Sequence, residues 1–253
     1  MLLSELKFLR SLQRKKYRRE HHCFLVEGTK LVNEILASDF VVRQVYATGQ
    51  WMAKHSNFQS EVQIVSEKEC ERISSLSSTP AVFALVEMKP DRPFSVGRYK
   101  KLLLLDGLKD TGNFGTIIRT ADWFGIDCII CSEDTVEMYN PKTIQATMGS
   151  FTRIDIYTYN LCNFIREYAT EYSFIGSFME GCPVQEYTFP EYAAIVLGNE
   201  SKGISAEVSS LIQEKITILL RNKNSVSQQQ PESLNVSISA AIICYELTKQ
   251  PNR

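Results

Sequence analysis

The sequence predicts an α/β fold in two domains, a small α/β domain over residues 1–95 and a larger domain with a parallel sheet over residues 100–253. Three observations predict it. Strand and helix patterns alternate from Lys101 onward, as they do when helices join parallel strands. Pro90 and Pro93 interrupt the pattern between the two parts. At 253 residues, 44% of them hydrophobic, the chain is long enough to bury two cores.

The first domain mixes helix and strand patterns. Residues 30–36 carry apolar side chains at helical spacing, which predicts a helix. Residues 41–46 and 81–86 are rich in valine and aromatic residues, which predicts two strands. We place the domain boundary between about residues 88 and 100, because two close prolines fit neither a helix interior nor a central strand.

The second domain is predicted as six strands separated by five helices. Gly125 follows the first of these helices at the position of a C-terminal cap. This rhythm is typical of a parallel sheet. The expected strands are 101–106, 126–131, 152–158, 173–178, 192–197 and 215–220, and the expected helices are 113–124, 142–149, 161–171, 205–212 and 235–248.

Three of these elements carry polar loops with a distinctive composition. Residues 110–119 follow the first strand, residues 198–205 follow the fifth, and residues 232–241 open the final helix. Carboxyl ends of parallel strands share one edge of a sheet, so we expect the loops to form one cleft. Glycine lets a backbone approach a ligand closely, and we expect a side chain at Gly198 to fill ligand space and leave the fold intact.

Several enzyme classes do not fit. The nearest match to a P-loop, Gly107 to Gly112, is followed by Asn113 where that motif needs lysine. The sequence has neither a nucleophile elbow nor a dinucleotide-binding glycine motif after a strand. All three histidines lie in the first 55 residues, away from the loops. Cys128 and Cys131 form a C-x-x-C inside an apolar strand pattern without a second pair, so we expect core packing and no metal.

Charge is concentrated at the amino terminus. Residues 1–22 carry seven Lys or Arg and two Glu, a balance of +5, so the remainder carries −6 in a chain of net charge −1. We expect this basic arm to contact nucleic-acid phosphates, with a solvated helical face as the alternative. The residues expected to do so are Arg14, Lys15, Lys16, Arg18 and Arg19.

The sequence also bears on compartment. It has no run of 18 apolar residues, and its amino terminus is basic where a signal peptide would carry an apolar core. Its seven cysteines are scattered, which is typical of free thiols in a reducing compartment. We therefore expect a cytoplasmic protein that does not enter a membrane.

The three loops, in this order, resemble the signature motifs of the SpoU/TrmH family of RNA ribose 2′-O-methyltransferases, in the knotted SPOUT superfamily. Residues 24–36 resemble the family's amino-terminal substrate-binding domain. The resemblance implies a carboxy-terminal trefoil knot, a homodimer, and methyl transfer from S-adenosyl-L-methionine to a ribose 2′-hydroxyl. Ribosomal RNA is the preferred substrate and transfer RNA the second choice. A non-catalytic RNA-binding factor with the same fold is the alternative from another class.

The resemblance also implies roles for single residues. Arg119, Asn113, Glu200 and Asn235 match the catalytic positions. Two roles stay open for Arg119, a base with a strongly depressed pKa or a group that orients phosphate and stabilises developing charge, because a guanidinium is a poor base near neutral pH. The residues implied to bind the cofactor are Leu197, Gly198, Asn199, Ile218, Leu220, Ser233 and Leu234.

One segment departs from the family pattern. Leu219 stands where members commonly have proline, and the connection from there to Ser233 is several residues longer. Residues 221–231 are polar and lack an apolar period, which predicts a mobile loop. Because it joins two elements implied to touch the cofactor, we expect it to act as a lid.

Overall fold

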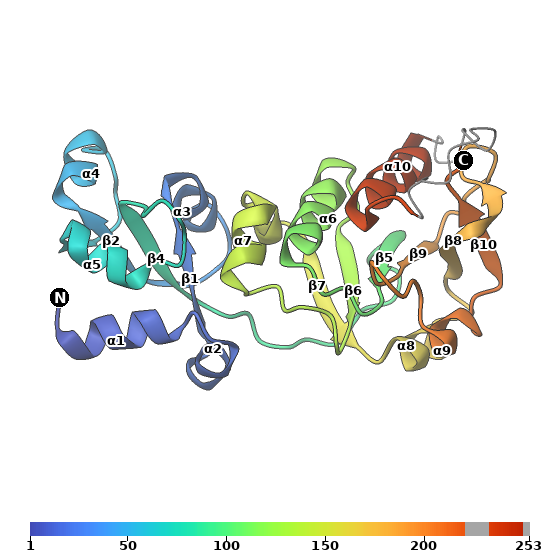
Figure 1. Cartoon of the computed structure of the whole chain (residues 1–253), viewed down its shortest axis with the longest axis horizontal. Coiled ribbons are helices and arrows are strands. Elements are labelled where there is room, and N and C mark those ends of the chain that lie inside the picture. The colour runs from blue at the N-terminus through green and yellow to red at the C-terminus, as the bar shows by residue number, and fades with distance from the viewer. Residues whose placement is uncertain (221–232, 250–253) are drawn as a thin grey trace, which may run out of the picture. The chain divides into compact units, whose positions relative to one another are not determined.

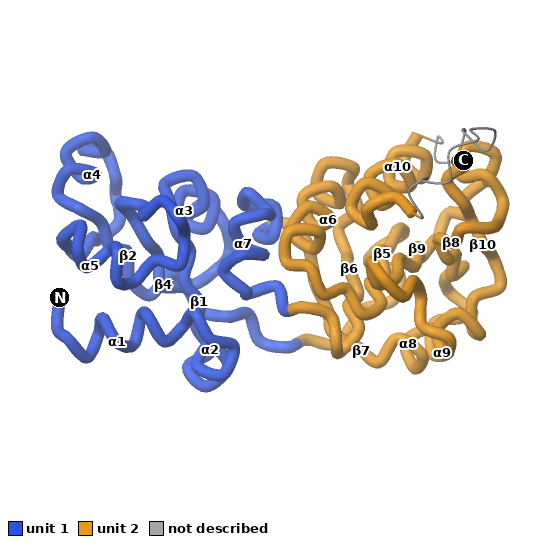
Figure 2. The backbone as a smooth tube through the Cα atoms, in the orientation of Figure 1, with its two compact units in different colours: residues 1–91, 137–152 blue, residues 92–136, 153–253 orange. Residues whose placement is uncertain are grey.

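The computed structural model describes residues 1–220 and 233–249, and it divides into two compact units (Figure 2). Unit 1 comprises Met1–Asp91 and Glu137–Thr152, and unit 2 comprises Arg92–Val136 and Arg153–Arg253. Residues 137–152, grouped with the second domain in the sequence, therefore pack in unit 1. The predicted loop 221–231 lies outside the described residues.

Unit 1 is built on a mixed sheet of four strands in the order β1-β4-β2-β3 (Figure 1). Strand β4 is antiparallel to both β1 and β2, whereas β2 and β3 are parallel. The core includes Leu9, Phe24 and Phe83, each fully buried. The strands are β1 (Cys23–Glu27), β2 (Val42–Thr48), β3 (Val62–Val65) and β4 (Val82–Glu87).

The helices of unit 1 are short. Ser66 opens one of them with a capping box, in which its hydroxyl accepts from the backbone of Glu69 while the Glu69 carboxylate accepts from the backbone of Ser66. The helices are α1 (Leu3–Ser11), α2 (Lys15–His21), α3 (Thr29–Leu36), α4 (Gly49–Lys54), α5 (Glu67–Ile73), α7 (Pro141–Thr147) and the 3₁₀ turn η1 (Ser150–Thr152).

The segment that contains α7 is held to unit 1 by polar and aromatic contacts. The Phe24 ring lies 4.6 Å from the ring of Tyr139, centroid to centroid, and 6.1 Å from that of Phe151. The Gln145 side chain donates to the Glu27 backbone carbonyl at 2.8 Å. These contacts explain why residues 137–152 pack in unit 1, although their neighbours in the chain belong to unit 2.

Unit 2 contains the predicted parallel sheet, with six strands in the order β10-β8-β9-β5-β6-β7. All five strand pairs are parallel. The central strands are uninterrupted apolar runs because both faces of the sheet are covered. The strands are β5 (Lys101–Leu105), β6 (Cys128–Ser132), β7 (Asp155–Tyr159), β8 (Ser173–Pro183), β9 (Ala193–Leu197) and β10 (Glu214–Thr217).

Helices cover both faces of this sheet (Figure 1): α6 (Thr111–Trp123) and α10 (Val236–Lys249) lie side by side on one face, and α8 (Leu161–Glu167) and α9 (Ala206–Ser209) lie on the other. The Asp110 carboxylate caps α6 by accepting from the backbone N–H of Asn113 at 2.6 Å. Gly125, with φ of +67°, follows the end of α6 as predicted. The edge of the sheet where β5, β6 and β9 end carries the polar loops.

Candidate functional site

The loop after β9 is a tight turn that needs its first glycine. Asn199 and Gly203 exchange two backbone hydrogen bonds, each 2.9 Å long. The Asn199 side-chain oxygen accepts from the backbone N–H of Ser201 at 2.9 Å. A Cβ on Gly198 would lie 2.1 Å from the Gly203 carbonyl carbon and 2.2 Å from the Ile204 nitrogen. The expectation that a side chain at Gly198 would leave the fold intact is therefore wrong, because it would strike the loop's own backbone first.

Two hydrogen bonds fasten this loop to the segment that leaves β5. The Asp106 carboxylate accepts from the backbone N–H of Ser205 at 2.7 Å, and the Asn199 amide donates to the Gly107 carbonyl at 2.7 Å. Gly107 has φ of +68° and its N–H donates to the Ser132 hydroxyl at 2.8 Å. The carboxyl ends of β5, β6 and β9 are thereby joined in one network. Asp106 was not predicted, although an acidic residue directly after an apolar strand was the signal that could have found it.

A chain of side-chain hydrogen bonds links the three polar loops. The Asn113 amide nitrogen donates to the Glu200 carboxylate at 3.1 Å, and the Asn235 amide nitrogen donates to the Asn113 side-chain oxygen at 2.9 Å. The Asn235 oxygen in turn accepts from the Ser237 hydroxyl at 2.6 Å. Three of the four predicted catalytic residues therefore meet, although they lie far apart in the sequence. Each amide has its donor and acceptor ends assigned by these partners.

Arg119 lies six residues after Asn113 on α6, about 9 Å further along the helix axis. Its side chain is exposed. Among residues 1–220 and 233–249, none forms a hydrogen bond or ion pair with its guanidinium. Arg119 is therefore available to an anionic group on a second molecule, such as an RNA phosphate.

The predicted cofactor residues differ in their surroundings. Leu197 is buried at the end of β9, whereas Ile218 is half-buried just after β10. Leu220 and Leu234 are 44% and 50% exposed, so each presents apolar surface to solvent. Ser233 is also exposed. Ile218 and Leu220 precede the segment 221–232 and Ser233 and Leu234 follow it, whereas the predicted lid itself lies outside the described residues.

The two cysteines of β6 lie in the core of unit 2. Cys128 and Cys131 are buried in β6 as predicted, and burial raises the pKa of both thiols. Over the described part of the chain, no three His, Cys, Asp or Glu side chains are grouped to hold a metal ion. Nor is any described helix long and apolar enough to cross a membrane.

The predicted phosphate-binding residues lie on α2 and just before it. Arg14, Lys15, Lys16 and Arg19 are exposed. Arg18 is different, because only 2% of its surface is exposed. Its guanidinium forms an ion pair with Glu137 and donates to the Leu12 carbonyl at 2.8 Å.

The expectation that Arg18 contacts a phosphate is therefore corrected, since its side chain fastens residues 137–152 to unit 1. Lys15 also approaches this carboxylate, with 3.7 Å between its Nζ and the Glu137 oxygen. The basic face of unit 1 is defined here by Arg14, Lys15, Lys16 and Arg19.

This chain is similar to known proteins along almost its whole length. The model of the SpoU rRNA methylase family matches residues 100–245, and that of the MRM3-like substrate binding domain matches residues 4–84. A Bacillus subtilis protein named as a 23S rRNA guanosine 2′-O-methyltransferase, RlmP, is 31% identical over 242 residues, which cover 94% of this chain and 93% of the relative.

Two solved structures extend the comparison. A TrmH-family protein of Porphyromonas gingivalis superimposes with a TM-score of 0.86 at 33% identity, covering 98% of both chains. An rRNA methyltransferase of Sinorhizobium meliloti with bound AdoMet superimposes with a TM-score of 0.82 at 26% identity, covering 100% of this chain and 98% of the other. The sheet of unit 2 and its helices are thus those of a known architecture.

Proposed function

This chain belongs to the SpoU rRNA methylase family, and we propose on that premise that it transfers a methyl group from S-adenosyl-L-methionine to a ribose 2′-hydroxyl of RNA. Ribosomal RNA is the proposed substrate, since the Bacillus subtilis relative is named for 23S rRNA. A cytoplasmic location is proposed with it, because that relative is a bacterial protein named for ribosomal RNA. The observation that carries the proposal is the hydrogen-bonded chain of Glu200, Asn113 and Asn235, which joins the three family motifs.

The residues present fit this cofactor. The half-buried and exposed side chains of Ile218, Leu220 and Leu234 offer apolar surface for the adenine and the methionine chain. The turn at Gly198 and Asn199 is held in one shape by the two backbone hydrogen bonds between Asn199 and Gly203, so it needs no rearrangement to receive a ligand. The cofactor supplies an activated methyl group on a sulfonium, so the protein must bind and align two molecules.

The acceptor hydroxyl must lose its proton as the methyl group arrives, and we assign that proton to water. Unit 2 contains no histidine, because all three lie at positions 21, 22 and 55. We assign Arg119 to the acceptor phosphate and to the developing negative charge on the ribose oxygen, because a guanidinium stays protonated near neutral pH. Glu200 holds the Asn113 amide in a fixed orientation, and Asn235 holds its other end.

We also propose that the carboxy-terminal strands and α10 form a trefoil knot. The strand order supports this, because β8, β9 and β10 lie on one side of β5 while β6 and β7 lie on the other. Family membership supports it further. A solved structure that traces residues 221–232 would test it directly.

The protein is proposed to work as a homodimer through the outer faces of α6 and α10. Trp123 is 84% exposed, and Ile238 and Tyr245 are about half exposed on the neighbouring helix. Exposed apolar side chains grouped in this way on neighbouring helices mark a contact surface. A second copy that covers it would also lie near Arg119 on α6. Analytical ultracentrifugation should find a dimer for the wild type and a monomer for Trp123→Glu.

One experiment decides the activity. The protein is incubated with a labelled methyl donor and bulk ribosomal RNA, and the modified nucleotide is mapped by mass spectrometry. A 2′-O-methylated nucleotide is expected, with transfer RNA as the comparison substrate. RNA binding without any methyl transfer would leave a non-catalytic factor and overturn the proposal.

A further inference from the structure

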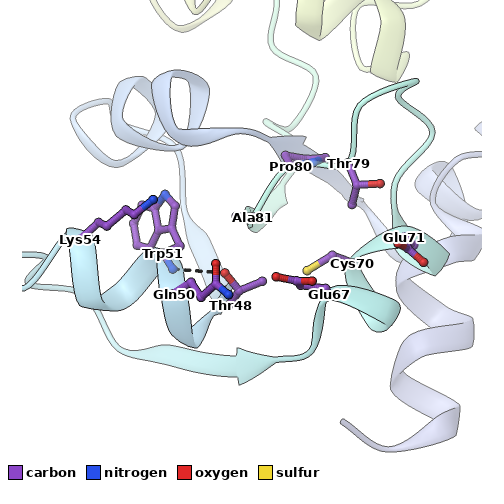
Figure 3. Close-up of a pocket in the computed structure, with 10 residues that line it drawn as sticks. All are labelled: Thr48, Gln50, Trp51, Lys54, Glu67, Cys70, Glu71, Thr79, Pro80 and Ala81. Carbon is purple, nitrogen blue, oxygen red and sulfur yellow. Dashed lines mark hydrogen bonds between the residues drawn. The ribbon is translucent and has the colours of Figure 1, made fainter.

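Unit 1 contains a cavity of about 290 Å³ between α4, α5 and the segment that leads into β4 (Figure 3). Thr48, the last residue of β2, and Glu67, which begins α5 shortly after β3, both line it. Because β2 and β3 are parallel, the cavity lies at their carboxyl ends. That is the edge where α/β sheets bind ligands.

One wall of the cavity is rigid and apolar. The Trp51 indole N–H donates to the Thr29 hydroxyl at 2.8 Å, and its ring stacks on His55 with 4.1 Å between centroids. Cys70 is buried, and burial raises its pKa to about 11, so the thiol is neutral at pH 7. A fixed tryptophan beside a neutral thiol suits a flat, partly apolar ligand.

The other side of the cavity carries hydrogen-bonding groups. Figure 3 shows the side chains of Thr48, Gln50 and Glu67 converging on the cavity. Glu71 lies one helical turn after Glu67 and also lines the cavity, as does Lys54. Within the described residues, none forms an ion pair with Glu67, Glu71 or Lys54. These charged groups are therefore free to bind a ligand.

The two carboxylates of the lining disfavour a phosphate beside them, because like charges repel. Carboxylates accept hydrogen bonds from N–H groups, including base amino groups. The volume lies just below the range of about 300–1,000 Å³ that holds drug-sized ligands, so it suits one nucleobase or nucleoside. RNA-binding proteins take unpaired bases into such pockets, where a base packs on aromatic rings and its Watson–Crick edge is hydrogen-bonded.

We propose that this cavity binds one unpaired RNA base, a base with an exocyclic amino group, and this inference rests on the proposed function. Glu67 and Glu71 accept hydrogen bonds from the N–H groups of that base. Guanine presents two adjacent donors to one carboxylate, so it should bind most tightly. Lys54 is placed to meet the phosphate of the same nucleotide. Uracil, which lacks an amino group, is the matched poor ligand.

Fluorine NMR on the full chain tests this with every hydrogen-bonding side chain of the cavity in place. The chain has two tryptophans, Trp51 and Trp123, so protein labelled with 5-fluorotryptophan gives two resonances, and a Trp123→Phe sample assigns them. Short oligouridylate is titrated against the same oligomer with one central guanosine. The guanosine oligomer should shift the Trp51 resonance and bind roughly tenfold more tightly, the scale of a charge-assisted hydrogen bond. Oligouridylate should leave that resonance in place.

Charge-removing variants supply the second test. Glu67→Gln with Glu71→Gln keeps the size of both side chains, and the preference for guanosine over uridine should disappear. Glu61→Gln, exposed and outside the cavity, is the matched control and should keep the preference. A preference for guanosine that persists in the double variant, at an unchanged melting temperature, overturns the proposal. In the NMR experiment, an equal shift of the Trp51 resonance with oligouridylate also overturns it. So does displacement of the guanosine oligomer by spermidine alone.

The two proposals can fail separately. If the cavity binds a base of the substrate, the double variant should raise the KM for RNA and leave kcat and cofactor affinity unchanged. If that variant transfers methyl groups with an unchanged KM for RNA, the proposed base site is wrong and the proposed enzymatic activity stands. If the protein prefers guanosine but transfers no methyl group to any RNA, the proposed enzymatic activity is wrong and the proposed base site stands.

Discussion

Asn113 couples the three polar loops of unit 2, because its amide donates to Glu200 and accepts from Asn235. The amide carries its donor and its acceptor on two separate atoms, so aspartate would lose the donor and leucine would lose both. Glu200 also lies 3.4 Å from the backbone N–H of Asp110, so its carboxylate spans two points of the loop after β5. A change at any of the three residues therefore alters the orientation of the others.

Arg119→Ala should reduce the rate of methyl transfer by about two orders of magnitude or more, because the guanidinium stabilises charge that develops only in the transition state. Cofactor affinity should stay at the wild-type value. Single-turnover kinetics at saturating RNA measures the first quantity and calorimetry the second. Arg166 is exposed on α8 at the other face of the sheet, so Arg166→Ala is the control and should change neither the rate of methyl transfer nor the cofactor affinity.

Arg119→Lys separates the two roles left open for this residue. A lysine acting as base would give a rate that rises with pH toward its ordinary pKa of about 10.4. A pH profile with the wild-type shape and a lower plateau would support charge stabilisation instead.

Gly198→Ala should destabilise the protein and weaken cofactor binding together, because its Cβ would lie 2.1 Å from the Gly203 backbone. Forcing atoms into a packed site costs about 1–3 kcal/mol, and more where backbone must move. Thermal unfolding with and without cofactor measures both effects. Gly49→Ala is the matched control, since a Cβ at that position would have nothing within 4 Å, and its melting temperature should not fall. An unchanged melting temperature for Gly198→Ala would contradict the steric argument.

At the scale of single residues, the sequence predicted the loops better than it predicted individual contacts. Asn113, Glu200 and Asn235 were found because their loops resemble family motifs and follow strands. Arg18 was misplaced because its partner, Glu137, is 119 positions away and belongs to a segment whose packing in unit 1 has no local signal. The pairing of distant charges depends on the fold.

At the scale of elements, predictability followed the length of the apolar pattern. The strands β5, β6 and β9 were predicted to within about two residues, because each is a buried run of strongly apolar side chains. Helix α9 spans only Ala206–Ser209, shorter than predicted, and β10 ends at Thr217 rather than near Leu220. Elements of four residues are too short to establish a period. The capping box of α5 is a local signal that does operate at this scale.

Glu69 should make unit 1 sensitive to acid through that capping box. Hydrogen bonds from the backbone N–H of Ser66, from the amino terminus and from the Ser66 hydroxyl lower the pKa of Glu69 from 4.5 to about 2. Because the folded-state pKa is depressed, this contribution is complete above about pH 4.5 and is lost as the pH falls toward 2.

The melting temperature of Glu69→Gln should therefore lie below that of the wild type at pH 7, and the two should converge near pH 2. Differential scanning calorimetry across this range measures the gap. Glu61→Gln, exposed and outside the box, should follow the wild type throughout. If the difference in melting temperature between Glu69→Gln and the wild type does not change with pH, Glu69 stabilises the fold through packing and not through its charge.

At the scale of the whole molecule, the two units divide the proposed work. Unit 2 carries the motif loops, whereas unit 1 carries the basic face and the cavity. The parallel sheet of unit 2 was predicted from alternation alone and is confirmed. The packing of residues 137–152 in unit 1 was not predictable, because it depends on contacts with Phe24 and Glu27 that are distant in sequence.

Replacing Arg14, Lys16 and Arg19 by alanine should weaken RNA binding and flatten its salt dependence, because each lost phosphate contact lowers the slope of log affinity against log salt by about 0.7–0.9. Cofactor affinity should not change. Filter binding at several salt concentrations measures the slope. Arg18→Ala gives the contrast, since it should lower the melting temperature by leaving Glu137 with only the more distant Lys15, and it should leave the salt slope unaltered. If the slope of log affinity against log salt is the same for the triple variant and the wild type, the basic face does not bind RNA.

The packing of residues 137–152 in unit 1 has a consequence for synthesis on the ribosome. The chain leaves unit 1 at Asp91 and returns at Glu137, so unit 1 is complete only when Thr152 has emerged. At about 5–20 residues per second, the 61 residues between Asp91 and Thr152 take roughly 3–12 s. Until Tyr139 and then Phe151 emerge, the Phe24 ring lacks these two neighbours, so the nascent chain presents an apolar surface to chaperones before its own later segment covers it.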